Sequence, residues 1–401
     1  MAIQLSHRAK AIKPSPTLSF SALAQNMINE GIDVINFSVG EPDFCTPKYI
    51  KKAGIEAIKN NFTRYTKSSG IIELREAISA KLKRDNNLDC SPEDILVSPG
   101  AKASIINILF TVCDPRDEVI IPSPYWVSYT SQVELVDAHP VFIKTNTSNN
   151  FKLNAKQLEE KIETLSNPKV LILNSPNNPT GIVYRRKSLE KIAEVCLRHN
   201  ILIISDEIYE KLIYDREEHV SIASLSPEIR DNTVLVNGVS KAYAMTGWRL
   251  GYAAGPSDII KRASRIQSHT TSCVNSMTQR AVLTALTEDD GSLEKMRCQF
   301  EKRRTYLVKE LNSIEHVTCN LPKGAFYALP NISYYLHNNN NKSITNSAEL
   351  CEYLLLEHKI AIIPGSAFGT NQHVRFSYAT SMENIKEGIK RFKYGLQCLT
   401  K

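Results

Sequence analysis

The sequence predicts an α/β protein with a large domain built on a mostly parallel sheet and a smaller second domain. Two patterns carry this prediction. Between about residue 90 and residue 240, short apolar runs alternate with amphipathic segments, as in successive βα units. After about residue 290 this alternating pattern ends, and a long charged helix is expected at residues 293–312. With 401 residues the chain is long enough for two domains.

Six short apolar runs are the candidate strands. They cover residues 95–97, 118–121, 140–144, 170–173, 201–205 and 233–236. The segments between them have helical periodicity. In residues 188–199, apolar side chains recur at positions i, i+3, i+4 and i+7 from Leu189, which places them on one helix face. Residues 71–84 repeat this pattern.

Composition and charge restrict the class of protein. The chain is 42% hydrophobic and 23% charged, and no apolar run approaches the ~18 to 20 residues that span a bilayer. The net charge is +7, but Lys and Arg alternate with acids, which favours small anionic ligands over nucleic acid. The N-terminus lacks the apolar core of a secretory signal, so we expect a cytoplasmic protein with no membrane partner. The nine cysteines have no metal-type spacing, and we expect them reduced, with no metal site.

Polar residues that follow the apolar runs are candidate site residues, because ligands of α/β proteins bind just beyond the carboxyl ends of strands. After residues 95–97, Gly100 precedes a helix whose first N–H groups, at Ala101 and Lys102, could receive a phosphate. A glycine there is also ordinary turn chemistry. After residues 170–173 comes an irregular loop with Asn178, which either holds an amide toward a ligand or only caps the backbone.

Two further strand ends carry charged residues. Asp206 ends one run, with Tyr209 three residues later, and a carboxylate at the end of an apolar strand is costly without a cationic partner. Lys241 follows another run, among small and apolar residues, where desolvation could lower its pKa as a Schiff-base lysine requires. Taken singly, Lys241 could be a solvated surface charge, and Arg249 could be an ion-pair partner. Together the four strand ends supply what a phosphorylated pyridine cofactor needs: a phosphate cradle, an amide, a buried acid and an amine.

Seven motifs occur in order along nearly the whole chain. They are KPSPT at 13–17, VGEPDF at 39–44, PYWVSY at 124–129, NNPTG at 177–181, DEIY at 206–209, SKAYAMTGWRLG at 240–251 and HVRFS at 373–377. This set resembles the fold-type-I pyridoxal-phosphate enzymes, specifically class I aminotransferases of the bacterial aspartate and prephenate aminotransferase subgroup. The resemblance implies a large domain at residues 46–290 with a seven-stranded sheet. A smaller α+β domain at 291–401 would be joined by an N-terminal segment, 1–45.

The resemblance also implies the cofactor, pyridoxal 5′-phosphate, and a role for each matching residue. Lys241 would form the Schiff base and then shuttle the substrate proton. Asp206 would pair with the pyridinium nitrogen and keep the ring an electron sink. Asn178 and Tyr209 would donate hydrogen bonds to the ring 3-oxygen. Trp126 would stack on the ring and border the substrate, although it could equally be a core aromatic.

The phosphate would be held at the helix start described above and by Arg249. Tyr65 would reach the phosphate from the second subunit of a homodimer with shared active sites. One departure from the family pattern is visible, because many relatives carry a serine three residues before the lysine and this chain has Gly238 there. Ser240 or the backbone would have to replace that contact.

The substrate would be held by a second group of residues. Arg375 would grip the α-carboxylate as a bidentate fork, with Gly40 and Asn178 lining the same site. Lys13 and Lys102 offer positive charge for a distal carboxylate. This favours aspartate or glutamate as amino donor and 2-oxoglutarate or oxaloacetate as acceptor. Prephenate could use the same cations, and aromatic amino acids or alanine are alternatives.

Two other classes of function stay open. A lyase or synthase on this fold would use the same lysine and acid, and persistent formation of pyridoxamine phosphate from amino acid alone would distinguish transamination from it. A regulator that uses the fold as an effector sensor would carry a DNA-binding domain, which the stretch before residue 13 is not expected to supply. Transamination is therefore the expected reaction.

Overall fold

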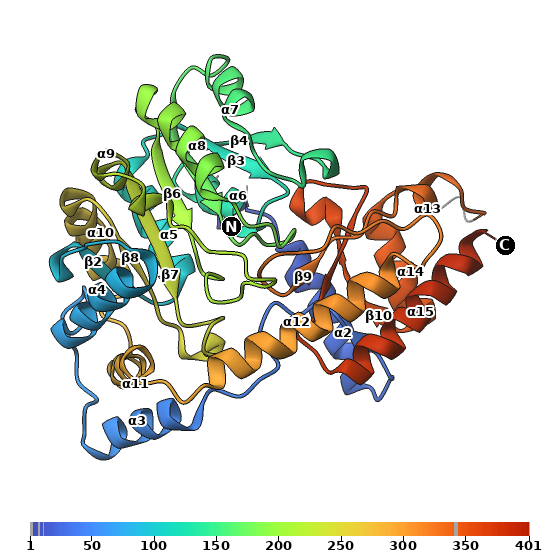
Figure 1. The fold of residues 1–401 in the computed structure, drawn as a ribbon, viewed down its shortest axis with the longest axis horizontal. Coiled ribbons are helices and arrows are strands. Elements are labelled where there is room, and N and C mark those ends of the chain that lie inside the picture. The colour runs from blue at the N-terminus through green and yellow to red at the C-terminus, as the bar shows by residue number, and fades with distance from the viewer. Residues whose placement is uncertain (1–2, 7–8, 11, 341–343, 401) are drawn as a thin grey trace.

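The computed structural model describes residues 3–6, 9–10, 12–340 and 344–400. Its centre is a seven-stranded sheet with the order β2-β8-β7-β6-β5-β3-β4 (Figure 1). The strands are β2 (Ile95–Ser98), β3 (Glu118–Ser123), β4 (His139–Lys144), β5 (Pro168–Asn174), β6 (Leu202–Asp206), β7 (Thr233–Gly238) and β8 (Gly251–Ala254). β8 runs antiparallel to both neighbours, and the other pairs are parallel. The predicted α/β class with a mostly parallel, seven-stranded sheet is confirmed.

All six predicted strands are present, with ends shifted by a few residues. The predictions from apolar runs do not include β8, because its four residues, GYAA, contain only one large side chain. The small residues there have a packing reason. Gly238 of β7 pairs with Gly251 of β8, and a Cβ added to Gly238 would lie 2.9 Å from the Cα of Gly251.

Helices cover both faces of this sheet. The helices of the chain are α2 (Pro16–Asn29), α3 (Lys48–Lys59), α4 (Ile72–Asn86), α5 (Ala101–Val112), α6 (Ser128–Leu135), α7 (Ala155–Ile162), α8 (Arg186–Arg198), α9 (Pro227–Asp231), α10 (Ser257–Thr270), α11 (Ser276–Thr287), α12 (Ser292–Leu311), α13 (Ser333–His337), α14 (Ser347–His358) and α15 (Met382–Thr400). Successive residues of β5 serve different cores. Val170 and Ile172 pack with α5, α6 and α10, whereas Leu171 and Leu173 pack with α7 and α8.

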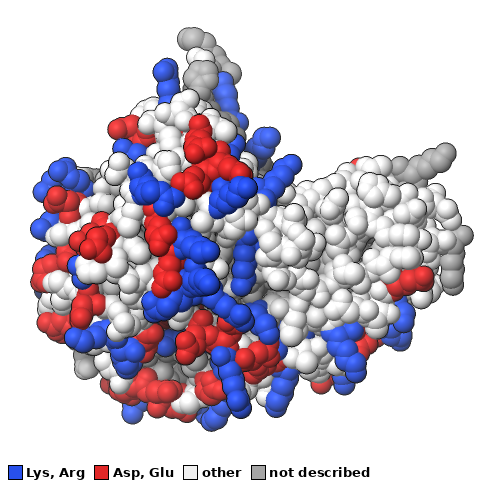
Figure 2. Space-filling view, turned by 45° about the horizontal axis from the view of Figure 1, so that its top comes forward, with Lys and Arg blue, Asp and Glu red and all other residues white. Residues whose placement is uncertain are grey.

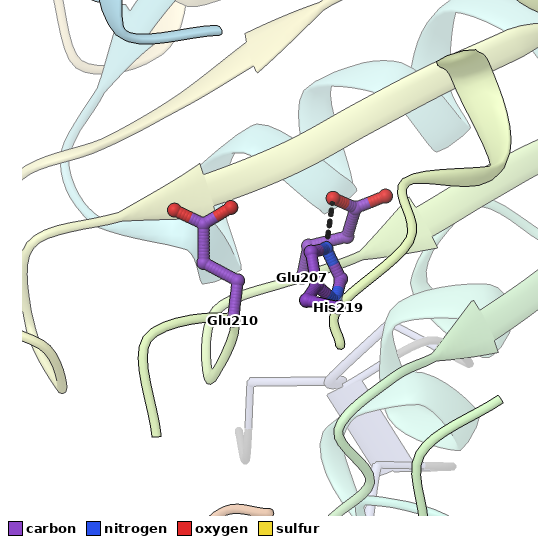
Figure 3. Close-up of side chains that lie close together, drawn as sticks. All are labelled: Glu207, Glu210 and His219. Carbon is purple, nitrogen blue, oxygen red and sulfur yellow. Dashed lines mark hydrogen bonds and ion pairs between the residues drawn. The ribbon is translucent and has the colours of Figure 1, made fainter. Parts of the chain in front are cut away.

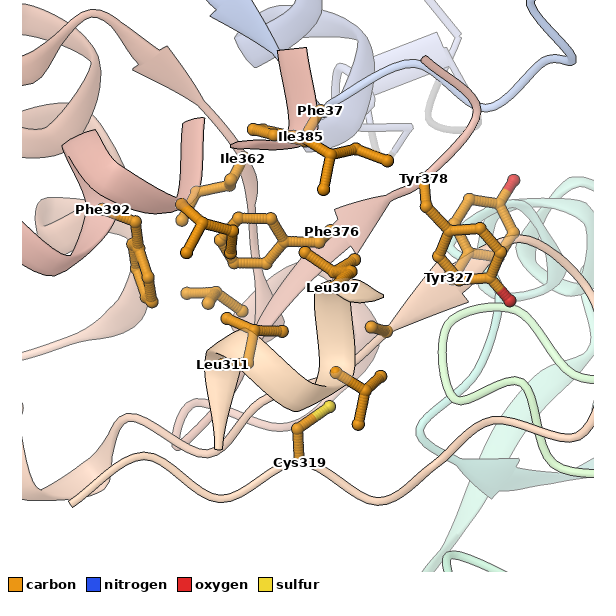
Figure 4. Close-up of a cluster of buried hydrophobic side chains, with 14 of the residues drawn as sticks. Phe37, Leu307, Leu311, Cys319, Tyr327, Ile362, Phe376, Tyr378, Ile385 and Phe392 are labelled. Atoms are coloured by element: carbon orange, nitrogen blue, oxygen red, sulfur yellow. The ribbon is translucent and has the colours of Figure 1, made fainter. Parts of the chain in front are cut away.

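The C-terminal elements build a separate hydrophobic core (Figure 4). β11 (Ile363–Pro364), β12 (Val374–Ser377) and β9 (Tyr327–Ala328) form a three-stranded antiparallel sheet. Phe376 of β12 lies at the centre of this core, with ring centroids 5.2 Å from Phe37 and 5.0 Å from Phe392.

The N-terminal segment contributes to the same region. β1 (Ile35–Asn36) pairs in parallel with β10 (Ile360–Ala361), and α2 contacts β10 and β11. These contacts agree with an N-terminal segment that joins the small domain. The bounds 1–45, 46–290 and 291–401 stay a prediction.

The sheet brings the predicted site residues together. β5, β6 and β7 are parallel neighbours, so their carboxyl ends meet at one edge. Among the described residues, no helix is both long and apolar enough to cross a bilayer. Figure 2 shows Lys and Arg side by side with Asp and Glu over much of one face, and a largely uncharged area on the right of that view.

Candidate active site

A cavity of about 410 Å³ lies where β5, β6 and β7 end. Every predicted site residue except Tyr65 and Lys13 lines it. Those that do are Gly40, Ala101, Lys102, Trp126, Asn178, Asp206, Tyr209, Ser240, Lys241, Arg249 and Arg375. Residues from both the large sheet and the C-terminal core therefore share one cavity.

Asp206 is the last residue of β6, and its carboxylate is buried. One oxygen accepts a hydrogen bond from the Tyr129 hydroxyl at 2.5 Å, and the other accepts from the Ile208 N–H at 3.2 Å. Burial raises the pKa of Asp206 to about 6. A buried carboxylate of this kind is strongly stabilised by a cation placed in the cavity beside it.

Lys241 lies three residues beyond the end of β7. Ser240, directly before it, is buried and also lines the cavity. The Nζ of Lys241 donates to the carbonyl oxygen of Gly40 at 2.6 Å. Burial, as the main cause, lowers the pKa of Lys241 to about 8. A substantial fraction of this side chain is therefore a neutral amine near pH 8, which is the form that attacks a carbonyl carbon.

Arg375 comes to the cavity from β12 and is buried. Its Nη2 donates to the carbonyl oxygen of Ser38 at 2.8 Å, and its Nη1 donates to the Asn178 side-chain oxygen at 3.1 Å. Its Nε is buried without a hydrogen-bond partner, and among the described residues no carboxylate forms an ion pair with this guanidinium. A buried cation without a counter-ion is costly, so this position is suited to bind a carboxylate from a ligand.

Tyr209 and Tyr327 complete the wall between Asp206 and Arg375. Their hydroxyl oxygens lie 3.0 Å apart, and the Arg375 guanidinium carbon lies 4.4 Å from the Tyr327 ring centroid. Asn178 already uses its side-chain oxygen to accept from Arg375, so its amide nitrogen is the group that it can offer to a ligand.

Another part of the cavity lining is suited to an anion. α5 begins at Ala101 after Gly100, which has φ 85°, and the first N–H groups of a helix attract negative charge. Arg249 lies beside this helix start, with Nη1 donating to the Thr246 carbonyl oxygen at 2.9 Å. The ammonium of Lys102 lies 5.0 Å from the centroid of the Trp126 ring.

Gly238 does not line the cavity, because it is held in the tight β7–β8 pairing, whereas Ser240 does. The replacement of the family's serine contact by Ser240 or the backbone stays a prediction.

Two predicted residues lie outside the cavity of this single chain. Tyr65 is 92% exposed, as expected for a residue whose predicted partner is another subunit. Lys13 is exposed, although Ser15 and Thr17 of the same motif line the cavity. The roles of both residues stay predictions.

Sequence reasoning missed Tyr129 and Tyr327. Tyr129 belongs to the PYWVSY motif, as does the predicted Trp126, so membership of that motif was a usable signal. Tyr327 belongs to none of the seven motifs, and only the pairing of β9 with β12 brings it to Arg375.

The fold and the cavity together define a class of enzyme. Residues 32–392 match the family described as aminotransferase class I and II. The chain belongs to this family and is an aminotransferase.

Individual relatives cover nearly the whole chain. A Petunia hybrida protein named bifunctional aspartate aminotransferase and glutamate/aspartate-prephenate aminotransferase is 47% identical over 98% of this chain and 83% of its own length. Bacillus subtilis aspartate aminotransferase is 43% identical over 98% of both chains. The crystal structure of aspartate aminotransferase from Rhizobium meliloti has a TM-score of 0.95 and 39% identity, covering 99% of this chain and 100% of its own. The Thermus thermophilus aspartate aminotransferase structure with maleate has a TM-score of 0.92 and 37% identity, covering 98% of this chain and 100% of its own.

Proposed function

We propose that this aminotransferase uses pyridoxal 5′-phosphate to move the amino group of a dicarboxylic amino acid, aspartate first, to 2-oxoglutarate. One observation carries the proposal. The buried guanidinium of Arg375 has no acid partner among the described residues and shares a cavity with Lys241 and Asp206. A receptor for an α-carboxylate is thereby placed beside an amine and an acid suited to this cofactor.

The residues present fit this cofactor. Asp206 is a buried carboxylate with a raised pKa, which a protonated pyridine nitrogen would relieve. The start of α5 and Arg249 offer N–H groups and positive charge to its phosphate. Asn178 and Tyr209 would donate to its 3-oxygen, and Trp126 would stack on its ring. When bound, the protonated ring accepts the electron pair that is left when the substrate Cα loses its proton.

The chain's own residues would then divide the work. Arg375 holds the α-carboxylate, which fixes Cα relative to Lys241. The Lys241 amine, with its pKa near 8, would take the Cα proton and deliver it to C4′ of the cofactor. Asp206, fixed by Tyr129 and the Ile208 N–H, holds the proton on the ring nitrogen. Gly40 accepts from the Nζ of Lys241 and so orients it before reaction.

A dicarboxylic substrate is supported by the cations at the cavity mouth. Lys102 lines the cavity, and exposed Lys13 lies in the motif whose Ser15 and Thr17 also line it. The related Thermus thermophilus structure holds maleate, a dicarboxylate. Prephenate, named for the Petunia hybrida relative, remains an acceptor that the same cations would suit.

The proposal includes a homodimer with shared active sites, because Tyr65 is exposed and does not line the cavity of its own chain. The partners would be the amino acid and 2-oxo acid substrates, with no nucleic acid. The cytoplasm is the proposed location.

A donor and acceptor panel tests the proposal. Purified protein loaded with pyridoxal 5′-phosphate is mixed with each amino acid alone, and its absorbance is followed. Aspartate and glutamate should convert the cofactor to pyridoxamine phosphate, and 2-oxoglutarate, oxaloacetate or prephenate should reverse the change. Release of ammonia or of an elimination product with no pyridoxamine phosphate would instead identify a lyase.

A further inference from the structure

A second group of buried charged side chains lies behind the strand end that carries Asp206 (Figure 3). We call Glu207, Glu210, His219, Lys81 and Asn86 the Glu207 cluster. The Glu207 carboxylate is 1% exposed, and the His219 Nε2 lies 2.8 Å from one of its oxygens. The other oxygen accepts from two serine hydroxyls, at 2.9 and 2.8 Å.

The cluster already contains its own cation. The ligand atoms of Glu207, Glu210 and His219 lie within 4.8 Å of one another, an arrangement that could hold a metal ion. However, the Lys81 ammonium pairs with Glu210 and donates to the Asn86 side-chain oxygen at 2.7 Å. The Asn86 amide nitrogen in turn donates to Glu210 at 2.7 Å. Both carboxylates are therefore satisfied by protein groups, which argues for a structural charge network rather than a metal site.

Within the cluster, charge balance favours a protonated histidine, whose Nδ1 is buried without a hydrogen-bond partner. Two buried carboxylates face one ammonium, so the cluster is neutral only if His219 is an imidazolium. Beside the cluster, Asp85 pairs with Lys211 and with Arg84, each at 2.8 Å, and the extra positive charge there lies on the Arg84 guanidinium, whose side chain is 58% exposed to solvent.

The pKa values in the cluster point the same way. Burial alone would lower the pKa of His219, but the charge of Glu207 and the hydrogen bond to it outweigh burial and raise that pKa above its ordinary value. Burial alone would raise the pKa of Glu210, but the positive charges of Lys81 and His219 outweigh burial and lower that pKa below its ordinary value. The hydroxyl of Tyr252 on β8, which also faces these acids, has a pKa raised well above its ordinary value, chiefly by burial, and stays neutral.

The cluster holds the segment that carries the cofactor residues. Asp206 lines the cavity, whereas its neighbour Glu207 joins the cluster on the other side of the strand. The Glu207 N–H donates to the Val236 carbonyl oxygen at 2.9 Å, and the Glu210 N–H donates to the Glu207 carbonyl oxygen at 2.9 Å. Tyr209 thus lies between two residues whose side chains are anchored in the cluster.

We propose that protonated His219 completes the charge balance of the Glu207 cluster, and that Glu207 and His219 are positioning residues that hold Asp206 and Tyr209 against the cofactor. The second half of this inference rests on the proposed function. The first half concerns the protein alone. Different measurements therefore test the two halves.

The charge of His219 is measured without cofactor. Nitrogen-15 spectra of labelled histidine side chains give its protonation state across pH, with the signal assigned from His219→Asn. We expect imidazolium at about pH 7.5, one unit above the ordinary histidine pKa of about 6.5. In Glu207→Gln the same ring should be neutral at that pH. A neutral His219 in the wild-type protein at pH 7.5 would overturn the inference, whatever the protein binds.

Positioning is measured with the cofactor. Glu207→Gln and His219→Asn should each weaken pyridoxal-phosphate affinity roughly tenfold and shift the pH midpoint of its visible absorbance. His219→Asn leaves the Glu207 carboxylate without its cation, and the double variant removes that carboxylate, so the double variant should lie closer to wild type than His219→Asn does. Asp215→Asn is the control, because it removes an exposed carboxylate that pairs with the buried Arg304 at 2.8 Å, in the same chain segment, without touching the cluster.

The outcomes separate the two proposals. If the control reproduces the loss of affinity and the absorbance shift, or if the two single effects simply add, Glu207 and His219 have no specific positioning role and the inference is wrong. If the wild-type protein takes up no cofactor at all, the proposed function fails, and the positioning role fails with it. The protonation state of His219 is decided in either case.

Discussion

At the scale of single residues, burial shifts the pKa values of Lys241 and Asp206 toward each other. It lowers the pKa of Lys241 to about 8 and raises that of Asp206 to about 6, because a low-dielectric site disfavours both charged forms. Two groups that titrate near neutrality in one cavity are typical of acid–base sites. The sequence predicted both residues from strand ends, but it could not predict how far their pKa values shift.

The pKa of Lys241 predicts how cofactor attachment depends on pH. Only the neutral amine attacks, so the rate of covalent attachment of pyridoxal phosphate should rise as pH increases through about 8 and level off above it. Borohydride trapping of the protein-bound cofactor at timed intervals measures this rate. Lys241→Ala should trap none and lose turnover, while keeping its fold and part of its cofactor affinity. A rate that is flat between about pH 6 and 9 would mean that burial does not set this amine's pKa.

Lys102 should recognise the distal carboxylate of the substrate. Its ammonium lies at the cavity wall beside Trp126, while Arg375 serves the α-carboxylate. Loss of one charge-assisted contact costs ~1.5 to 3 kcal/mol, so Lys102→Ala should lower kcat/KM roughly 10- to 100-fold. The loss should affect aspartate, glutamate and prephenate and spare alanine and phenylalanine. An equal loss for all donors, together with weaker cofactor binding, would assign Lys102 to the phosphate instead.

At the scale of elements, the start of α5 was predictable and the strand beside it was not. Gly100 before an amphipathic run is a local signal for a helix start that can hold an anion. β8 lies next to β2 in the sheet although 152 residues, 99 to 250, separate the two strands in the sequence. A short run of small residues contains no information about such a distant partner. The close approach of Gly251 to Ala101 shows why small residues are needed there.

Gly100→Ala should weaken cofactor binding by displacing Arg249. Gly100 has φ 85°, and an added Cβ would lie 2.5 Å from the Arg249 Nη2. Gly31→Ala is a matched control, since Gly31 has φ 83° but its added Cβ meets nothing within 4 Å. Both variants should lose about 1 to 3 kcal/mol of stability from backbone strain. Only Gly100→Ala should also raise the dissociation constant of pyridoxal phosphate, measured by absorbance titration. Equal pyridoxal-phosphate affinities in the two variants would show that Arg249 does not bind the phosphate.

At the scale of the whole molecule, the site depends on contacts that no local pattern contains. Arg375 is 134 residues after Lys241, and it reaches the cavity because β12 pairs with β9 and β11 in the C-terminal core. The predictions of Arg375, Trp126 and Gly40 came from motifs of a known family rather than from periodicity or charge. Tyr327 lies outside those motifs and was missed for that reason. Local patterns predicted the sheet and its charged strand ends, whereas the substrate side of the cavity required the family resemblance or the structure.

The last whole-molecule prediction concerns the second subunit. A surface hollow of about 500 Å³ is bordered by Arg249, Thr246 and Trp248, and because Arg249 and Thr246 also line the cavity, a tyrosine from another chain could enter there. Tyr65 is 92% exposed in the single chain, so a site completed by Tyr65 requires two copies.

Tyr65→Ala and Lys241→Ala proteins should each be inactive at limiting cofactor. After dissociation and mixing, each hybrid dimer should regain one intact site, because one chain supplies Lys241 and the other Tyr65. Tyr394→Ala alters another exposed tyrosine, 60% exposed, and it should be active before any mixing. A protein that sediments as a monomer, or hybrids that recover no activity, would show that each chain builds its site alone.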